Sequence, residues 1–384
     1  MSYDSTKIFT NDYYCTDKHG GILSIDLKNL HKNYKNISSV ASKSITSATV
    51  KSNGYGLGLD KVAKTFYSAG CRVFFVSHLS EAIILNDAIE SKNITIYVLN
   101  GLPKNSIDEY IKEGFRPVIG SLDELHDWVN YSDKKKLPPI ALNIETGFTR
   151  LGLYPNDLIK VASVIKSKKN INISLIMSHL ACAEDKNSNM NVEQLILFKK
   201  AAEIFPNVPR SICNSAGLFC GENYHLELVR PGISLYGGYE GIYKRVELHP
   251  VVSLHAPIIQ VKEVSNGVRI GYGSTYKFNK KTLVGLVSIG YADGLIRSLS
   301  TSDDNKYGAD LFVNGIKTPI VGRISMDITA IDLTNVPSEN CKRGELVEIL
   351  GPNQNIDQLS KNAGTISYEM LSRLGSRFKR VYND

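Results

Sequence analysis

The sequence lacks any apolar run long enough to cross a membrane. Its longest apolar stretches, such as residues 283–292, are about ten residues long, whereas a spanning helix needs about 20. Residues 1–20 are polar and lack the apolar segment of a secretory signal, so we expect no such signal. The six cysteines form no Cys-x-x-Cys pair and no zinc-ligand spacing, which predicts reduced thiols and no metal site. These absences predict a soluble, cytoplasmic protein that is not attached to a membrane.

Concentrated charge is also missing. The chain has 45 Lys and Arg against 38 Asp and Glu, a formal net charge of +7, but the excess is spread out and the densest basic run, residues 134–136, is short. This pattern favours a solvated basic surface over a nucleic-acid site. Apolar residues make up 42% and charged residues 22%, which excludes a disordered chain, a collagen-like repeat and a disulfide-dense miniprotein.

The chain is long enough for two domains, because 384 residues exceed the size at which one hydrophobic core keeps growing. Its first two-thirds alternates β-rich runs with amphipathic helical patterns, one of which follows Asp26 and another of which runs from Leu59 to a stop at Gly70. The predicted strands are 21–26, 45–51, 72–77, 94–100, 115–120, 140–145, 173–179, 210–215 and 226–232. Eight or nine such units favour a (β/α)8 TIM-like barrel, a parallel sheet covered by helices.

After about residue 245 the pattern changes to successive short strands without long helices. Turn signals at Asn266-Gly267, Asn314-Gly315 and Gly351-Pro352 separate these strands. We therefore predict an N-terminal extension over 1–20, a β/α barrel over 21–245, and a mostly antiparallel β domain over 246–384.

The first candidate for chemistry is Lys51, which closes the predicted strand 45–51. Active sites of β/α barrels lie at the carboxyl ends of the strands. Partial desolvation there lowers the pKa of a lysine and makes its amine a usable nucleophile, as in a Schiff base. The alternative is a lysine that extends along apolar surface towards water.

Two later strand ends carry the residues of a candidate phosphate site. Asn214 and Ser215 follow one predicted strand, and Arg230, Gly232 and Ile233 follow the next. Phosphate sites in barrels are often built from the loops after the last two strands, where hydroxyl and backbone N–H groups donate. Ordinary turn chemistry is the alternative.

The β domain carries two tyrosines in glycine-rich turns, Tyr272 and Tyr291. Their hydroxyls are available to whatever docks there, although most tyrosines simply pack.

Eight segments in register resemble alanine racemase, the pyridoxal-phosphate (PLP) enzyme of fold type III, from about residue 21 to residue 382. They are VKSNGYGLG (50–58), IETGFTRLG (144–152), NSAG (214–217), LVRPGISLYG (228–237), GYGSTY (271–276), IGYADGLIR (289–297), IVGRISMD (320–327) and TISYE (365–369). The resemblance implies PLP-dependent conversion of L-alanine to D-alanine, which supplies cell-wall peptidoglycan, in a homodimer whose active sites are shared between subunits.

The resemblance also implies the catalytic roles. Lys51 would hold PLP covalently and act as one Cα base, and Tyr272 of the partner subunit would act from the opposite face. His179 would stack near the cofactor. Arg230 would donate to the pyridine nitrogen and keep it unprotonated, which weakens the electron sink and favours reprotonation over side reactions.

The same resemblance implies the binding residues. The phosphate would be bound by Tyr55, Ser215, Gly232, Ile233 and Tyr368, with Asn214 beside them. Arg150 would lie near the cofactor phenolate and the substrate carboxylate, which the backbone N–H of Met326 would also hold from the other subunit. The substrate entrance and the dimer contact would be shaped by Tyr291, Arg297 and Asp327.

The sequence departs from the family pattern at four positions. Asn143 stands where many members carry a carbamylated lysine, so we expect Asn143 to orient Arg150 with an anion such as chloride. Leu57 replaces a common His of the lysine motif. Ser211 stands where a His often supports the pyridine-facing arginine, and Ser325 replaces a frequent Cys. None of these changes removes a base or a cofactor anchor; they bear on tuning and specificity.

Three other functions remain open. A racemase of serine, lysine or a broad range of amino acids would share these motifs. A decarboxylase of the same fold is expected to carry an acidic residue in place of Arg230. A non-catalytic PLP-binding protein is expected to lack the β domain and the opposite base.

Overall fold

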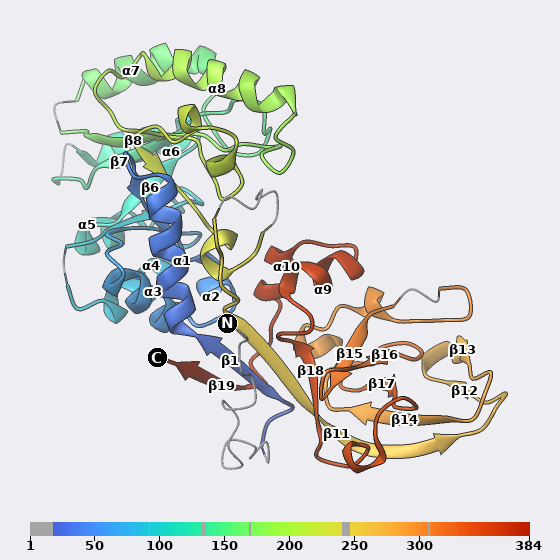
Figure 1. Cartoon of the computed structure of the whole chain (residues 1–384). Helices are drawn as coiled ribbons and strands as arrows, with labels where there is room; N and C mark the ends of the chain where they lie inside the picture. The colour runs from blue at the N-terminus through green and yellow to red at the C-terminus, as the bar shows by residue number, and fades with distance from the viewer. Residues whose placement is uncertain (1–17, 92, 133–134, 169, 240–245, 306–307) are drawn as a thin grey trace. The chain divides into compact units, whose positions relative to one another are not determined.

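The computed structural model describes residues 18–91, 93–132, 135–168, 170–239, 246–305 and 308–384 (Figure 1). Most of the predicted extension over 1–20, part of the basic run 134–136 and the predicted boundary at 245 lie outside these residues. The chain divides into two compact units. One is Asn29–His249, and the other combines residues 18–28 with Pro250–Asp384.

The unit Asn29–His249 is built on parallel strands whose carboxyl ends face one side. The strands are β2 (Ile45–Thr46), β3 (Ala48–Thr49), β4 (Val73–Val76), β5 (Thr95–Val98), β6 (Arg116–Ile119), β7 (Ile140–Asn143), β8 (Ile173–Met177), β9 (Arg210–Ser211) and β10 (Leu228–Val229). A seven-stranded sheet runs in sequence order from β3 to β9, and β10 pairs with β2 in parallel. The backbone N–H of Arg230 donates to the carbonyl of Cys213 at 2.9 Å, which links the β10 end to the β9 end. The strands therefore follow one another around a closed ring, as the predicted barrel requires.

Helices alternate with these strands. They are α1 (Leu27–Val40), α2 (Lys51–Tyr55), α3 (Leu59–Ser68), α4 (Leu79–Ala88), α5 (Ile107–Glu113), α6 (Leu122–Ser132), α7 (Leu158–Lys166) and α8 (Asn189–Ala202). The helices predicted after Asp26 and from Leu59 are confirmed as α1 and α3, and Gly70 just beyond α3 takes a φ of +102°. Strand side chains fill the barrel interior, where the rings of Phe75 and Tyr97 stack at 4.9 Å.

The strand predicted over 21–26 forms as β1 (Ile22–Asp26), but its place in the barrel is a correction. It pairs antiparallel with β11 (Val252–Val264) and parallel with β19 (Lys379–Asn383). A short apolar strand followed by a helix looks like a βα unit whichever sheet it joins, so its pattern could not show this pairing.

The second unit is mostly antiparallel, as predicted. With β1, β11 and β19 its strands are β12 (Arg269–Ile270), β13 (Tyr276–Lys277), β14 (Thr282–Val287), β15 (Asp310–Val313), β16 (Ile316–Pro319), β17 (Thr329–Asp332) and β18 (Leu346–Leu350). An eight-stranded sheet contains all of them except β12 and β13, which form a hairpin. Two short helices, α9 (Ile356–Asn362) and α10 (Ser367–Ser372), were not predicted.

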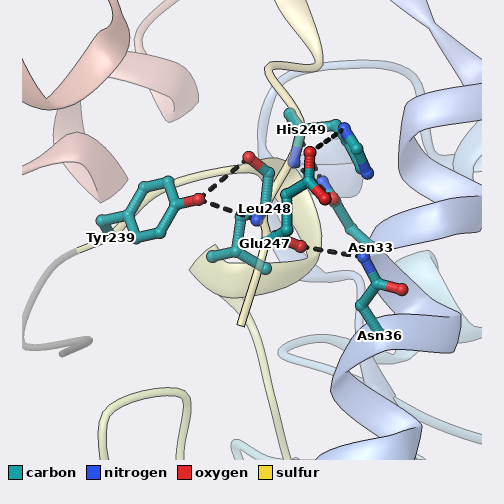
Figure 2. A network of polar contacts seen from close by, with 6 residues as sticks. All are labelled: Asn33, Asn36, Tyr239, Glu247, Leu248 and His249. Carbon is teal, nitrogen blue, oxygen red and sulfur yellow. Dashed lines mark hydrogen bonds and ion pairs between the residues drawn. The ribbon is translucent and has the colours of Figure 1, made fainter. Parts of the chain in front are cut away.

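A buried asparagine of α1 anchors the chain where it leaves the barrel. The Asn33 side chain donates to the carbonyl oxygens of Leu235 and His249 at 3.2 and 2.9 Å and accepts the His249 N–H at 2.7 Å. The Tyr239 hydroxyl donates to the Leu248 carbonyl and accepts the Leu248 N–H, as Figure 2 shows. These bonds satisfy the backbone groups of a segment that belongs to no sheet. Among the described residues, no helix has the length and apolar character needed to cross a bilayer.

Candidate active site

Lys51 lies immediately beyond the carboxyl end of a barrel strand. The strand ends at Thr49 rather than at the predicted residue 51, and Lys51 begins the short helix α2. Burial lowers the pKa of the Lys51 ammonium, and the nearby Arg150 lowers it further, while Glu81 opposes both. The amine is therefore more often neutral than that of a solvated lysine, as its position predicts.

The turn after Lys51 is left-handed over four successive residues. Ser52, Asn53, Gly54 and Tyr55 have φ values of 55°, 56°, 63° and 54°. Only Gly54 adopts this region without a side-chain penalty, and each of the others costs roughly 1–2 kcal/mol. Such strain persists only where surrounding contacts impose it.

Arg230 is buried, and both terminal nitrogens of its guanidinium have partners. It donates to the Ser211 hydroxyl and the Ser178 carbonyl, and its Nη2 lies 3.4 Å from Nδ1 of His179. Burial lowers the pKa of Arg230 to about 10, so it stays charged at neutral pH. Ser211, which stands where a family histidine is common, still supplies an acceptor to this arginine.

Three cations act together on His179. Burial lowers the pKa of its imidazole well below the usual range, and Arg230, Arg150 and Lys51 each lower it further. The neutral ring contacts the edge of Phe148 at 5.6 Å between centroids. Because Arg230, Arg150 and Lys51 all lie at the carboxyl ends of the strands, this end of the barrel favours an anionic ligand.

The predicted phosphate segments form one compact cradle. The buried Ser215 hydroxyl oxygen accepts the N–H groups of Gly232 and Ser234 at 2.8 and 3.3 Å. A Cβ placed on Gly232 would collide with the Tyr55 hydroxyl, so the backbone at Gly232 lies directly against that side chain. Ile233 is also buried. Asn214, by contrast, directs its side-chain oxygen to the Gly217 N–H at 2.9 Å and serves as a turn cap.

Arg150 is carried by a loop organised around one carboxylate. The Glu145 side chain accepts the backbone N–H groups of Gly147 and Arg150. Burial raises its pKa, but the bonds from the backbone of residues 147–150 outweigh that effect and lower the pKa overall. The exposed Arg150 guanidinium stacks over Phe148 at 4.1 Å. Asn143 donates to the carbonyl of Leu151 at 2.7 Å, so it holds this loop directly.

The second unit presents the remaining candidates near its surface. Tyr272 and Met326 are 68% and 53% exposed, and Tyr291 is 40% exposed. The turn containing Tyr291 is bonded to residues 325–326, because the Tyr291 N–H donates to Ser325 O and the Ala292 N–H donates to Met326 O.

Three further candidates of this unit occupy different places. Asp327 is paired with Arg377 at 2.7 Å, whereas Arg297 is exposed and Tyr368 lies in α10. Their roles remain predictions.

Sequence reasoning missed the carboxylates that hold the site loops. Glu145 lies inside the predicted segment 144–152, but its residue type alone does not indicate that its carboxylate bonds the backbone. Glu81 accepts the Asn53 N–H at 3.1 Å from 28 residues away, and no spacing rule joins the two positions. Among the described residues, no group of three or more His, Cys, Asp or Glu side chains is placed to hold a metal ion.

The fold and these groups define a β/α-barrel enzyme that carries a desolvated lysine and two arginines at the carboxyl ends of its strands, with a β domain after the barrel. Residues 25–240 match the family model of the alanine racemase N-terminal domain, and residues 251–382 match that of the C-terminal domain. The chain belongs to the alanine racemase family.

Known relatives span nearly the whole chain. Alanine racemase of Brucella abortus is 38% identical over 378 residues, covering 94% of this chain and 93% of the relative. A catabolic alanine racemase of Agrobacterium fabrum is 39% identical over 363 residues, covering 94% and 92%. The structure of alanine racemase from Bartonella henselae with covalently bound pyridoxal phosphate has a TM-score of 0.87 and 34% identity, covering 94% of this chain and 99% of that one.

Proposed function

We propose that this chain is a PLP-dependent alanine racemase that interconverts L- and D-alanine and supplies D-alanine for peptidoglycan. The observation that carries the proposal is a set of contacts at the strand ends that also carry the desolvated Lys51. The Arg230 guanidinium lies 3.4 Å from the His179 ring, that ring packs against Phe148, and Arg150 stacks over Phe148. This arrangement combines an amine of lowered pKa with a positive pocket, as an anionic aldehyde cofactor and a carboxylate substrate require.

The residues present fit the cofactor. The cradle at Ser215 and Gly232 has room for a glycine but for no larger residue, since a Cβ on Gly232 would reach the Tyr55 hydroxyl. Hydroxyl and backbone N–H donors in such a cradle suit a phosphate. The phosphate would be held by Tyr55, Ser215, Gly232 and Ile233 of the barrel, and Asn214 shapes the turn beside them. The family resemblance adds Tyr368 to this group.

Racemisation requires proton removal on one face of the substrate Cα and proton return on the other. When bound, PLP withdraws electrons from Cα and acidifies its proton. Lys51 would hold the cofactor covalently at rest. Once the substrate amine has displaced it, the free Lys51 amine would serve as the base on one face, because its lowered pKa leaves it able to accept a proton. Tyr272 of the partner subunit serves on the other face. Each positioned base contributes roughly 10²- to 10⁴-fold.

Arg230 sets the type of reaction. It remains charged near neutral pH, so it would donate a hydrogen bond to the pyridine nitrogen without transferring its proton. The unprotonated ring would be a weaker electron sink, which would favour rapid reprotonation over transamination or decarboxylation. The engagement of Arg230 with Ser211 and the Ser178 carbonyl supports this role, because it fixes the guanidinium.

The substrate carboxylate is held by Arg150 and by the backbone N–H of Met326 from the partner subunit. Tyr291, Arg297 and Asp327 form the entrance and the dimer contact. The exposure of Tyr272, Tyr291 and Met326 supports a surface that a second subunit covers. The enzyme is a cytoplasmic homodimer with shared active sites.

The test is conversion of L-alanine to D-alanine by the purified protein supplied with PLP, measured by chiral chromatography. The same assay with serine and lysine distinguishes a broad racemase, and release of CO2 from basic amino acids identifies a decarboxylase. We expect D-alanine from the wild-type protein and none from Lys51→Ala. Absence of D-alanine from the wild-type protein with PLP bound would overturn the proposal.

A further inference from the structure

Neighbouring loops at the carboxyl ends of the barrel strands are joined in pairs by a side chain from the next helix. Glu81 of α4 accepts N–H groups from the loops after β3 and β4. Glu124 of α6 accepts N–H groups from the loops after β5 and β6. Gln194 of α8 bonds Thr146, after β7, and both His179 and Ala181, after β8. Each bridge fixes one loop against the next.

The bridges made by Glu81 and Glu124 are built alike. One Glu81 oxygen accepts the Asn53 N–H at 3.1 Å, and the other accepts the N–H groups of Ser77 and His78 at 2.9 and 3.3 Å. One Glu124 oxygen accepts the Leu102 N–H at 2.9 Å, and the other accepts the Gly120 N–H at 2.8 Å. Each glutamate is the third residue of its helix.

The two glutamates differ in what their bridges hold. Glu124 joins loops that carry none of the candidate site residues. Glu81 bonds the backbone of Asn53, in the middle of the left-handed turn that follows Lys51. The Asn53 side chain in turn accepts the Leu59 N–H at 2.9 Å, where α3 begins. The strained turn is therefore fixed at its centre by one carboxylate.

We propose that Glu81 is a positioning residue for racemisation, which holds the left-handed turn in the conformation that presents the Lys51 amine to the reacting carbon. This inference rests on the proposed function and adds to it a residue of α4, three elements after the helix that begins at Lys51. Glu81 does not touch the reacting atoms; it acts through the backbone of Asn53 and through its charge.

The charge of Glu81 acts on the same amine. Arg150 also lowers the pKa of Lys51, and the pKa of the His179 imidazole is lowered mainly by burial and further by the nearby cations. Glu81 offsets the effects of burial and of Arg150 on the Lys51 pKa. Replacing the carboxylate with an amide keeps one of the two acceptor oxygens and removes this opposing charge. The pKa of Lys51 then falls further.

The experiment compares Glu81→Gln, Glu81→Ala and the matched control Glu124→Gln in the full-length holoenzyme. The visible absorption band of the bound PLP is titrated with pH, and the acidic limb of kcat for alanine is recorded. We expect both midpoints to shift to lower pH in Glu81→Gln and to stay at the wild-type value in Glu124→Gln. Hydrogen exchange of the Asn53 amide should be about tenfold faster in Glu81→Ala than in wild type, as loss of one hydrogen bond predicts.

Equal pH profiles for Glu81→Gln and Glu124→Gln, or unchanged Asn53 exchange in Glu81→Ala, would overturn the proposal. If Glu81→Ala fails to fold, the two glutamine variants still decide the question, because each keeps one acceptor oxygen and loses one, at bridges of the same construction. The spectral titration and the amide exchange need no turnover. A wild-type protein without racemase activity would therefore refute the proposed function and leave the role of Glu81 separately measurable.

Discussion

Gly232→Ala tests whether the Ser215 cradle holds the cofactor phosphate. The added methyl would collide with the Tyr55 hydroxyl and lie 3.2 Å from Tyr55 Cζ. Tyr55 cannot retreat, because it is buried and stacked on Tyr236 at 4.4 Å, and the Tyr236 hydroxyl is bonded to the Thr49 carbonyl. Overpacking of this kind costs about 1–3 kcal/mol. If that cost falls on the cofactor-bound state, PLP binds roughly 5- to 150-fold more weakly.

The assay is the dissociation constant of PLP from the full-length protein, measured by equilibrium dialysis. Gly120→Ala is the matched control, since a Cβ there meets its nearest neighbour at 3.5 Å, an ordinary contact, and PLP should bind as in wild type. Tyr55→Phe removes the oxygen that the new methyl meets, so the double variant with Gly232→Ala should recover part of the loss beyond additivity. Wild-type affinity in Gly232→Ala, or strict additivity in the double variant, would refute the cradle geometry.

Three further changes test the groups around the cradle. Ser211→Ala removes an acceptor from the buried Arg230, and we expect the free energy of unfolding of the holoenzyme in urea to fall by about 1.5–3 kcal/mol, whereas an unchanged value would contradict that bond. The pKa of Glu145 is lowered on folding, so its stabilising effect is present above its unfolded pKa and is lost as pH falls through the folded value. Thermal unfolding of wild type and Glu145→Gln should therefore converge at low pH, and parallel curves would count against the carboxylate. Chloride should lower KM for alanine in wild type but not in Asn143→Ala, where the predicted anion site and the bond to the Arg150 loop are both lost; identical chloride responses would exclude that site.

Much of the fold was predictable because strand and helix periodicity are local properties. The barrel strands follow from short β-rich runs, and the helices α1 and α3 follow from 3.6-residue patterns. Pairing partners are not local, which is why β1 was placed in the wrong sheet. The helices α9 and α10 are only seven and six residues long, too short for a periodic signal.

The same distinction between local and non-local properties applies to the candidate site. Lys51, Arg230 and Gly232 were found because their residue types and strand-end positions carry chemistry. The left-handed turn after Lys51 was not, because Ser52 and Asn53 rarely take that conformation and only distant contacts impose it. The carboxylates that bond backbone N–H groups were missed because the bonds join residues with no fixed spacing.

Proton exchange at the Cα of alanine tests most directly whether two bases act on opposite faces of that carbon. Tyr272→Phe in deuterated water should interconvert the enantiomers at least 10²-fold more slowly, while Lys51 still exchanges the Cα proton of one enantiomer with solvent. Interconversion at the wild-type rate, or equal loss of exchange for both enantiomers, would contradict the two-base account.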